Sequence, residues 1–306
     1  MKFNIYLINK LILISIIISF IQLTKEKMSA CPELTLNNGV KIPQFGLGTF
    51  ELANCTQNIL ESFKIGYRHL DTAHFYENEK EVGEAVLKSN LKREEIFVTS
   101  KIWPTDFDHA EKALNDMFER LKLTYIDLVL LHWPFGDYIS AWKALEKFAK
   151  EGKIKSLGLS NFYGEDLKKI LEICTIRPVC DQVECHLYKN KLEFKKELDK
   201  ENIVLVAYCP IRHIDDKLKK NPDIVKMMEK YKKSIYQIVL RWHIQNGYIP
   251  IPKSSSVEHM KSNFNIFDFE LTSDEMNVLN SIPQSKGKYI DDGTKEWVLS
   301  HPPKDE

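Results

Sequence analysis

The chain has 306 residues, of which 43% are hydrophobic and 28% are charged, so it is expected to fold around a substantial core rather than stay disordered. Lysine plus arginine equals aspartate plus glutamate at 43 each, and this balance disfavours nucleic acid or an anionic membrane surface as a partner. The six cysteines are too sparse and clustered for a disulfide framework, and they lack the paired spacing of a zinc site. Free thiols in a reducing compartment and no metal are therefore expected.

Residues 1–27 differ in composition from the rest. Residues 11–21 are almost continuously apolar, which is typical of a signal-peptide core. They are short for a membrane span, which needs about 20 apolar residues, and the charged run at 25–27 is unlike a cleavage site. The segment is interpreted either as a signal or membrane anchor or, as we favour, as sequence upstream of a start at Met28. Residues 28–306 are then expected to form one cytoplasmic domain.

The folded part is expected to open with a small β-hairpin. Apolar and polar residues alternate at 34–36 and 40–42 around Asn38-Gly39, the strongest short-range signal for a hairpin turn. After the hairpin, short apolar runs alternate with longer amphipathic stretches. The expected strands are residues 45–48, 67–70, 96–100, 126–131, 154–159, 179–183, 203–207 and 249–251.

Helical periodicity follows most of these strands. The lysine-rich residues 218–233 are expected to form a solvated helical face. Alternating strands and helices imply a parallel sheet. Eight such units without a linker or a composition break predict an α/β fold, a single closed (β/α)8 TIM barrel. Apolar residues recur every three or four positions in residues 57–65, 77–88, 109–121, 141–150 and 235–246.

Chemistry in such a barrel lies at the carboxyl ends of the strands. Asp71 and Tyr76 follow the second expected strand, Lys101 follows the third and His132 follows the fourth. An ammonium beside a phenol favours the phenolate, so Lys101 is expected to lower the pKa of Tyr76 and make it a usable proton donor. Asp71 would keep the lysine charged, and His132 would orient a carbonyl oxygen. Each residue alone is better explained as a structural one, but their convergence favours a catalytic set.

Several motifs of the chain resemble those of the aldo-keto reductases, in family order and at family spacing from about Leu34 to near the C-terminus. The resemblance implies a barrel that reduces aldehydes or ketones. It makes Tyr76 the acid, Lys101 and Asp71 its tuning pair, and His132 the orienting residue, which agrees with the chemical interpretation. The motifs are Gly46-Leu47-Gly48-Thr49-Phe50, residues 71–79, Leu130-Leu131-His132-Trp133-Pro134, Gly158-Leu159-Ser160-Asn161-Phe162 and Ile251-Pro252-Lys253-Ser254.

The resemblance also implies NADPH as cofactor, bound extended across the barrel mouth. The chain lacks the Gly-x-Gly-x-x-Gly motif of dinucleotide-binding open sheets, which agrees with a barrel. Ser160, Asn161 and Gln182 are implied to bond the nicotinamide carboxamide. Tyr208 is implied to stack on the ring, because a flat aromatic beside polar groups suits a planar amide-bearing ring.

The adenosine end of the cofactor is implied to lie against Lys253, Ser254 and Asn263. Glu258-His259 stand where many family members have an arginine, and neutral histidine binds phosphate less well, so NADH remains an alternative. The complete implied cofactor set is Gly48, Thr49, Phe50, Asp71, Ser160, Asn161, Gln182, Tyr208, Cys209, Pro210, Ile211, Lys253, Ser254, His259 and Asn263.

The substrate pocket is expected to be open. Only eight residues separate Trp133 from Trp142, and the tail after Ser281 is short, so a long lid is not expected. Small aldehydes, aldoses or keto-sugars are the expected substrates of a monomeric enzyme. The candidate walls are Phe50, His74, Phe75, Trp103, His132, Trp133 and Phe135.

Two other functions stay open at this point. A catalytically silent barrel, acting as a cofactor sensor or a structural protein, would keep the cofactor site and lose the chemistry. An isomerase or aldolase would use Lys101 for a Schiff base, which requires an apolar pocket around the amine. The second alternative leaves Gln182, Tyr208 and Lys253 unexplained.

Overall fold

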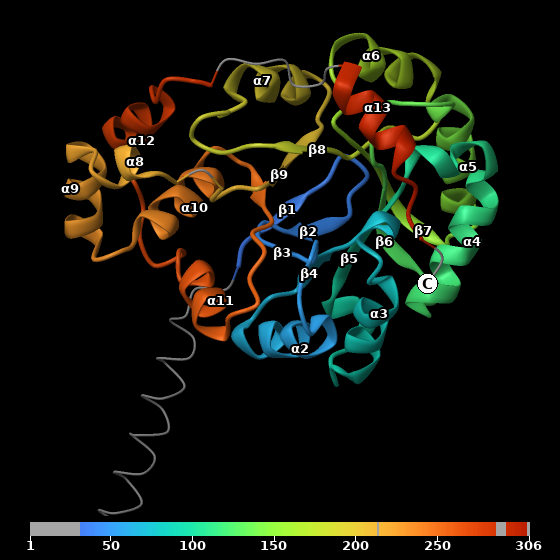
Figure 1. The fold of residues 1–306 in the computed structure, drawn as a ribbon, viewed down its shortest axis with the longest axis horizontal. Helices are drawn as coiled ribbons and strands as arrows, with labels where there is room; N and C mark the ends of the chain where they lie inside the picture. Colours follow the sequence, from blue (N-terminus) through green and yellow to red (C-terminus); the bar gives the residue numbers. More distant parts are fainter. Residues whose placement is uncertain (1–30, 213, 286–291, 305–306) are drawn as a thin grey trace, which may run out of the picture.

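The computed structural model describes residues 31–212, 214–285 and 292–304, so the extension interpreted at residues 1–27 lies outside the described residues. Eight parallel strands form one sheet in chain order, from β3 to β10. Hydrogen bonds from Gly46 N to Pro250 O (3.0 Å) and from Gly48 N to Pro252 O (3.3 Å) join the two edges and close the sheet into a barrel. Helices surround the strands (Figure 1). This arrangement confirms the predicted (β/α)8 barrel.

Each barrel strand overlaps the range expected from the sequence. β5 and β6 are buried along their whole length, as strands covered on both faces require. The close approach at the seam depends on glycine, since a Cβ on Gly48 would lie 2.8 Å from the carbonyl oxygen of Ile251. The strands are β3 (Leu47–Gly48), β4 (His69–Asp71), β5 (Phe97–Ile102), β6 (Ile126–Leu131), β7 (Ile154–Ser160), β8 (Cys180–Glu184), β9 (Val204–Tyr208) and β10 (Ile249–Pro250).

Each of the five helical ranges predicted from apolar periodicity overlaps a helix of the structure, and the prediction for the lysine-rich region is wrong. The region 218–233 is not one solvated helix, because the Asn221 side chain caps a new helix at Pro222. That helix also buries Ile224 and Met227. No helix in the described ranges is long and apolar enough to span a membrane. The helices are α2 (Cys55–Ile65), α3 (Glu79–Lys88), α4 (Ala110–Leu121), α5 (Tyr138–Lys150), α6 (Gly164–Ile173), α7 (Leu192–Lys200), α8 (Asp216–Lys219), α9 (Pro222–Tyr231), α10 (Ile235–Gln245), α11 (Val257–Phe264), α12 (Ser273–Asn280) and α13 (Asp292–Ser300).

The predicted hairpin closes the amino-terminal end of the barrel. It consists of β1 (Glu33–Thr35) and β2 (Lys41–Pro43), which pair antiparallel. Its apolar side chains Leu36 and Ile42 are buried in the cluster that fills the barrel interior. In the turn, Asn37 Nδ2 donates to the carbonyl oxygen of Pro178 at 2.8 Å. With this end filled, the carboxyl ends of the strands are the place for a ligand site.

One buried carboxyl group in the barrel wall has no role in the expected chemistry. Asp181 of β8 is fully buried, and neither of its carboxyl oxygens has a hydrogen-bond partner among the described residues. Burial raises the pKa of Asp181 well above its ordinary value of 3.8, and nearby backbone amides and the Lys191 charge oppose this only in part. Because the folded-state pKa exceeds the unfolded one, the wild-type protein loses stability as the pH rises above the ordinary pKa.

Replacing Asp181 with asparagine is therefore expected to stabilise the fold. The amide keeps the shape of the side chain and removes the buried ionisable group, so the free energy of unfolding at pH 8 should rise by about 1–3 kcal/mol. Urea unfolding at pH 5 and at pH 8 measures it, and the gain should be larger at pH 8. An equal or absent gain at the two pH values would contradict the assignment of a costly buried carboxyl.

Candidate active site

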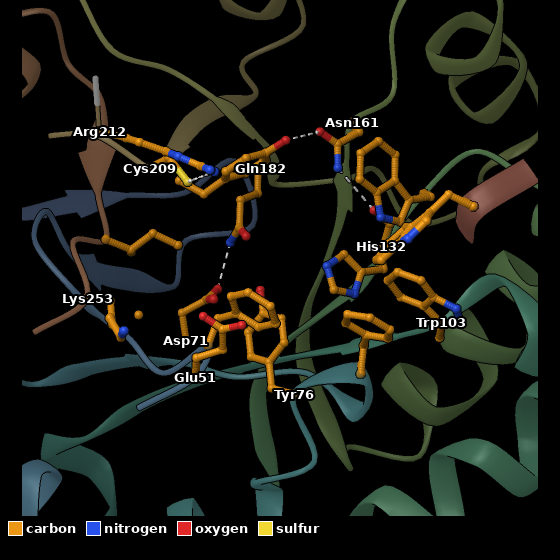
Figure 2. Close-up of a pocket in the computed structure, with 17 residues that line it drawn as sticks. Glu51, Asp71, Tyr76, Trp103, His132, Asn161, Gln182, Cys209, Arg212 and Lys253 are labelled. Atoms are coloured by element: carbon orange, nitrogen blue, oxygen red, sulfur yellow. Dashed lines mark hydrogen bonds between the residues drawn. The ribbon is translucent and has the colours of Figure 1, made fainter. Parts of the chain in front are cut away.

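A cavity of about 470 Å³ opens at the carboxyl ends of the strands (Figure 2). Cavities of this size suit small-molecule ligands. Of the residues expected from the sequence, those on its lining are Gly48, Phe50, Asp71, Phe75, Tyr76, Trp103, His132, Trp133, Asn161, Gln182, Tyr208, Cys209 and Lys253. The sequence analysis missed four further lining residues, which are Glu51, Arg212, Ile251 and Trp297.

The Lys101 ammonium lies beneath the cavity lining and holds the polar residues at the base of the cavity together. Its Nζ donates to Asp71 Oδ1 at 2.6 Å, to the Thr72 carbonyl oxygen at 2.8 Å and to Tyr76 Oη at 3.1 Å. These contacts use all three ammonium protons. The Lys101 side chain is 0% exposed and that of Asp71 is 2% exposed. Tyr76 thus accepts a hydrogen bond from a fixed cation, and its own proton is left for another acceptor.

The loop that carries Tyr76 is held by an asparagine. After β4, a turn of 3-10 helix spans His74–Tyr76, and Glu77 then adopts a left-handed conformation that ends it. Asn78 Oδ1 accepts from Thr72 Oγ1 at 2.6 Å, and Asn78 Nδ2 donates to the Thr49 carbonyl oxygen at 2.8 Å. This network ties the loop to the end of β3 and so fixes the phenol over Lys101.

Burial is the main cause of the pKa shifts of the residues at the bottom of the cavity. It raises the pKa of Tyr76 well above 10, and the Asp71 charge adds to the rise. The net lowering of the Tyr76 pKa that the sequence predicted is therefore wrong, because desolvation of the phenolate and the Asp71 charge raise this pKa despite the neighbouring ammonium. Burial and the Lys101 charge lower the pKa of His132 well below 6.5. At neutral pH the site holds a protonated phenol and a neutral imidazole.

Amide and hydroxyl groups lie on the next strand ends. Gln182 Nε2 donates to Asp71 Oδ2 at 2.6 Å, so Gln182 also anchors the carboxylate. Asn161 Oδ1 accepts from Tyr208 Oη at 3.1 Å. Ser160 is buried behind them and donates through Oγ to the Gln182 carbonyl oxygen at 3.0 Å. Asn161, Gln182 and Tyr208 therefore bring two side-chain amides and a flat ring together on the cavity lining.

Aromatic rings form the opposite side of the cavity. Phe75 stacks on Trp103 with ring centroids 4.0 Å apart and an interplanar angle of 12°. Trp297 of α13 meets Phe75 edge-on at 5.7 Å. The helix is held there because Trp103 Nε1 donates to the Val298 carbonyl oxygen at 3.1 Å and Val298 is buried. The short tail was expected to leave the mouth open, and this is corrected in one respect, because the tail reaches the cavity lining through Trp297.

Two of the expected substrate walls do not lie on the lining. His74 is turned away and pairs through Nδ1 with Asp106 Oδ2 at 2.8 Å. Phe135 is buried and stacks behind Trp133, with centroids 5.9 Å apart. Phe135 thus supports a wall rather than forming one. The other expected walls, Phe50, Phe75, Trp103, His132 and Trp133, line the cavity.

Charged residues gather at the end of the cavity away from the aromatic rings. Arg212, Lys253 and Glu51 lie on this side in Figure 2, opposite His132 and Trp103. Several expected cofactor residues are not on the cavity lining, namely Thr49, Ser160, Pro210, Ile211, Ser254, His259 and Asn263. Among these, Ser254 and Asn263 are buried, and His259 is exposed on α11. Thr49 uses its hydroxyl to donate to the Asp71 carbonyl oxygen at 2.9 Å.

Comparison with known proteins extends the resemblance noted in the motifs. Residues 46–284 match the model of the aldo/keto reductase family. The glyoxal reductase of Bacillus subtilis is 39% identical over 253 residues, which cover 81% of this chain and 91% of that protein. The aldo-keto reductase family 1 member A1 of Gallus gallus is 37% identical over 294 residues, covering 83% of this chain and 90% of that protein.

Solved structures give the same result. A Bombyx mori aldo-keto reductase in complex with NADP superposes with a TM-score of 0.80 and 30% identity, covering 88% of this chain and 97% of that one. An aldo/keto reductase from Brucella melitensis gives a TM-score of 0.78 with 35% identity, covering 83% of this chain and 98% of that one. Over most of its length, the chain is therefore similar to aldo-keto reductases in both sequence and fold.

Proposed function

The chain belongs to the aldo/keto reductase family, and we propose that it uses NADPH to reduce aldehydes and ketones to alcohols, with Tyr76 as the general acid. Family membership makes the chain an oxidoreductase. The observation that carries the finer proposal is the contact of Lys101 with both Asp71 and Tyr76 at the base of a cavity that also contains His132.

The residues of the cavity fit a nicotinamide dinucleotide. Asn161 and Gln182 offer donors and acceptors for a carboxamide, and the Tyr208 ring lies beside them. Arg212 and Lys253 supply positive charge at the other end, where phosphates would lie. NADPH, when bound, supplies a hydride to the carbonyl carbon. We favour NADPH over NADH because of Lys253, and His259 in place of an arginine keeps NADH as an alternative cofactor.

The proposed proton transfer follows from the hydrogen bonds among Asp71, Tyr76 and Lys101. Tyr76 Oη accepts from Lys101 Nζ, so its proton is available to the carbonyl oxygen of the substrate. The phenolate left behind would lie 3.1 Å from the ammonium, which stabilises it. His132, neutral at physiological pH, would hydrogen-bond the same oxygen and hold it towards Tyr76. Asp71 keeps Lys101 charged and in position.

The aromatic side of the cavity favours apolar carbonyl compounds. The rings of Phe75, Trp103 and Trp297 form this side, with no charged side chain among them. Such a surface gains free energy by burying apolar area and offers few partners to sugar hydroxyls. We therefore propose aldehydes with an aromatic or apolar group as better substrates than aldoses or keto-sugars.

Replacing Trp297 with alanine is expected to raise KM for an aromatic aldehyde roughly two- to tenfold, because one edge-on aromatic contact is lost. The Kd of NADPH should not change, since Trp297 lies on the side of the cavity away from Arg212 and Lys253. Steady-state kinetics and cofactor titration measure the two effects. Leu299→Ala, on the same helix and outside the lining, is the matched control. Equal losses in both variants would show that α13 acts only through folding.

The cellular setting is proposed from surface and thiol chemistry. None of the six cysteines, all of which lie among the described residues, forms a disulfide bond, which supports a reducing compartment such as the cytoplasm. Outside the cavity lining, the exposed large apolar residues Leu87, Ile173, Tyr236 and Leu299 lie on four different helices, which supports a monomer. The proposed partner is the small-molecule carbonyl substrate.

The proposed function is tested by following NADPH oxidation, and separately NADH oxidation, with a panel of aldehydes, ketones and sugars. Turnover with NADPH is the expected result, and the ratio of the two rates shows the cofactor preference. Tight cofactor binding without turnover on any carbonyl would overturn the proposal and favour the cofactor-sensor alternative. Turnover without added nicotinamide cofactor would favour the aldolase alternative.

A further inference from the structure

Arg212 is a cation at the cavity that no other described residue neutralises. It lies in the turn that follows β9, where its backbone N–H donates to the Cys209 carbonyl oxygen at 3.0 Å. The guanidinium approaches Cys209 Sγ at 3.9 Å, and within the described ranges it forms no ion pair. An exposed guanidinium with five donors and one weak contact is free to bind an anion.

The position of Arg212 points to the cofactor end of the cavity rather than the substrate end. Figure 2 shows Arg212, Cys209 and Lys253 on one side and His132 and Trp103 on the other. Cys209 has a left-handed backbone, with φ of 53°, which turns the chain sharply after Tyr208 and brings Arg212 back to the lining. The guanidinium therefore lies just beyond the residues proposed for the nicotinamide.

We propose that Arg212 binds the pyrophosphate group that NADPH and NADH share, an inference that rests on the proposed function. In either cofactor the pyrophosphate is the first anionic group beyond the nicotinamide riboside. Of the residues expected at the adenosine end, Ser254, His259 and Asn263 lie outside the lining that contains Arg212, and Lys253 lies on it. The guanidinium fork matches phosphate oxygens in two parallel hydrogen bonds. Glu51 is an acidic residue on the same lining.

An arginine that binds the shared pyrophosphate does not distinguish NADPH from NADH. Because both cofactors carry the pyrophosphate, Arg212 should strengthen the binding of both by the same factor. Discrimination between NADPH and NADH is then left to Lys253 and the start of α11, where only NADPH places its additional phosphate. A residue that bound the additional phosphate would instead act on NADPH alone.

The test is calorimetric titration of the full chain with NADPH, NADH, ADP-ribose and adenosine 2′-phosphate. Arg212→Ala is expected to raise the Kd of NADPH and of NADH by the same factor, about tenfold or more. The Kd of ADP-ribose should rise by a similar factor, and the Kd of adenosine 2′-phosphate should not change. Arg212→Lys, which keeps the charge and loses the fork, should give an intermediate loss.

Lys217→Ala is the matched control, since Lys217 is an exposed cation on α8 outside the lining. It should leave all four Kd values unchanged. Unchanged Kd values in Arg212→Ala, or a loss confined to NADPH and adenosine 2′-phosphate, would overturn the assignment. A wild-type protein that binds neither cofactor would instead overturn the proposed function itself.

Discussion

Tyr76→Phe is expected to lower kcat for carbonyl reduction by about a thousandfold or more, because general acid catalysis contributes on the order of 10²–10⁴. The phenyl ring preserves the packing, since Tyr76 contacts the rings of Phe50 at 5.0 Å and His132 at 5.7 Å. The Oη group is lost, and with it the proton donor and the acceptor of the Lys101 hydrogen bond. The Kd of NADPH should stay within about twofold of wild type, measured by fluorescence titration beside the rate.

The same variant separates the reductase from its alternatives. Retained turnover in Tyr76→Phe would contradict the acid assignment and leave His132 as the proton source. A Schiff-base mechanism at Lys101 is already disfavoured, because the amine is fully buried and donates three hydrogen bonds. His132→Phe is a useful companion, expected to raise KM more than Tyr76→Phe does, since the imidazole orients the substrate.

Lys101→Met is expected to abolish reduction and to destabilise the fold by about 3–5 kcal/mol, because it leaves the Asp71 carboxylate buried without its cation. Adding Asp71→Asn to this variant removes the uncompensated carboxylate charge. The double variant should recover most of the lost stability, and it should remain inactive, because the ammonium that stabilises the phenolate is still absent. Urea unfolding and kcat, measured on both single variants and the double variant, test this.

A surface ion pair provides the control for the buried one. Lys147 and Glu111 are 2.6 Å apart with both side chains more than half exposed, at 54% and 55%. Lys147→Met should cost less than about 1 kcal/mol and leave kcat unchanged. If Lys101→Met were no more destabilising than Lys147→Met, the Asp71–Lys101 pair would not be charged in the folded protein, and the role given to Lys101 would fail.

Much of the fold could be predicted because the strands and helices have distinct local periodicities of apolar residues. The buried strands are short apolar runs, and amphipathic helical stretches alternate with them along the chain. The order of the elements and the barrel could therefore be predicted from the sequence alone. The convergence of Asp71, Tyr76, Lys101 and His132 followed too, because parallel strands in a barrel end at one face. The lysine-rich region is an exception, because its composition predicts one helix whereas Asn221 and Pro222 begin a new one.

The sequence by itself thus determined the barrel, the family motifs and the residues at the strand ends. Only the tertiary structure decided that Trp297 and Arg212 join the cavity, that His74 and Phe135 leave it, and that the pKa of Tyr76 rises. The Trp103–Val298 hydrogen bond that brings α13 to the pocket joins residues 195 positions apart. Neither such a long-range contact nor the loss of water around a buried phenol is encoded in local periodicity, because both depend on which distant segments pack together.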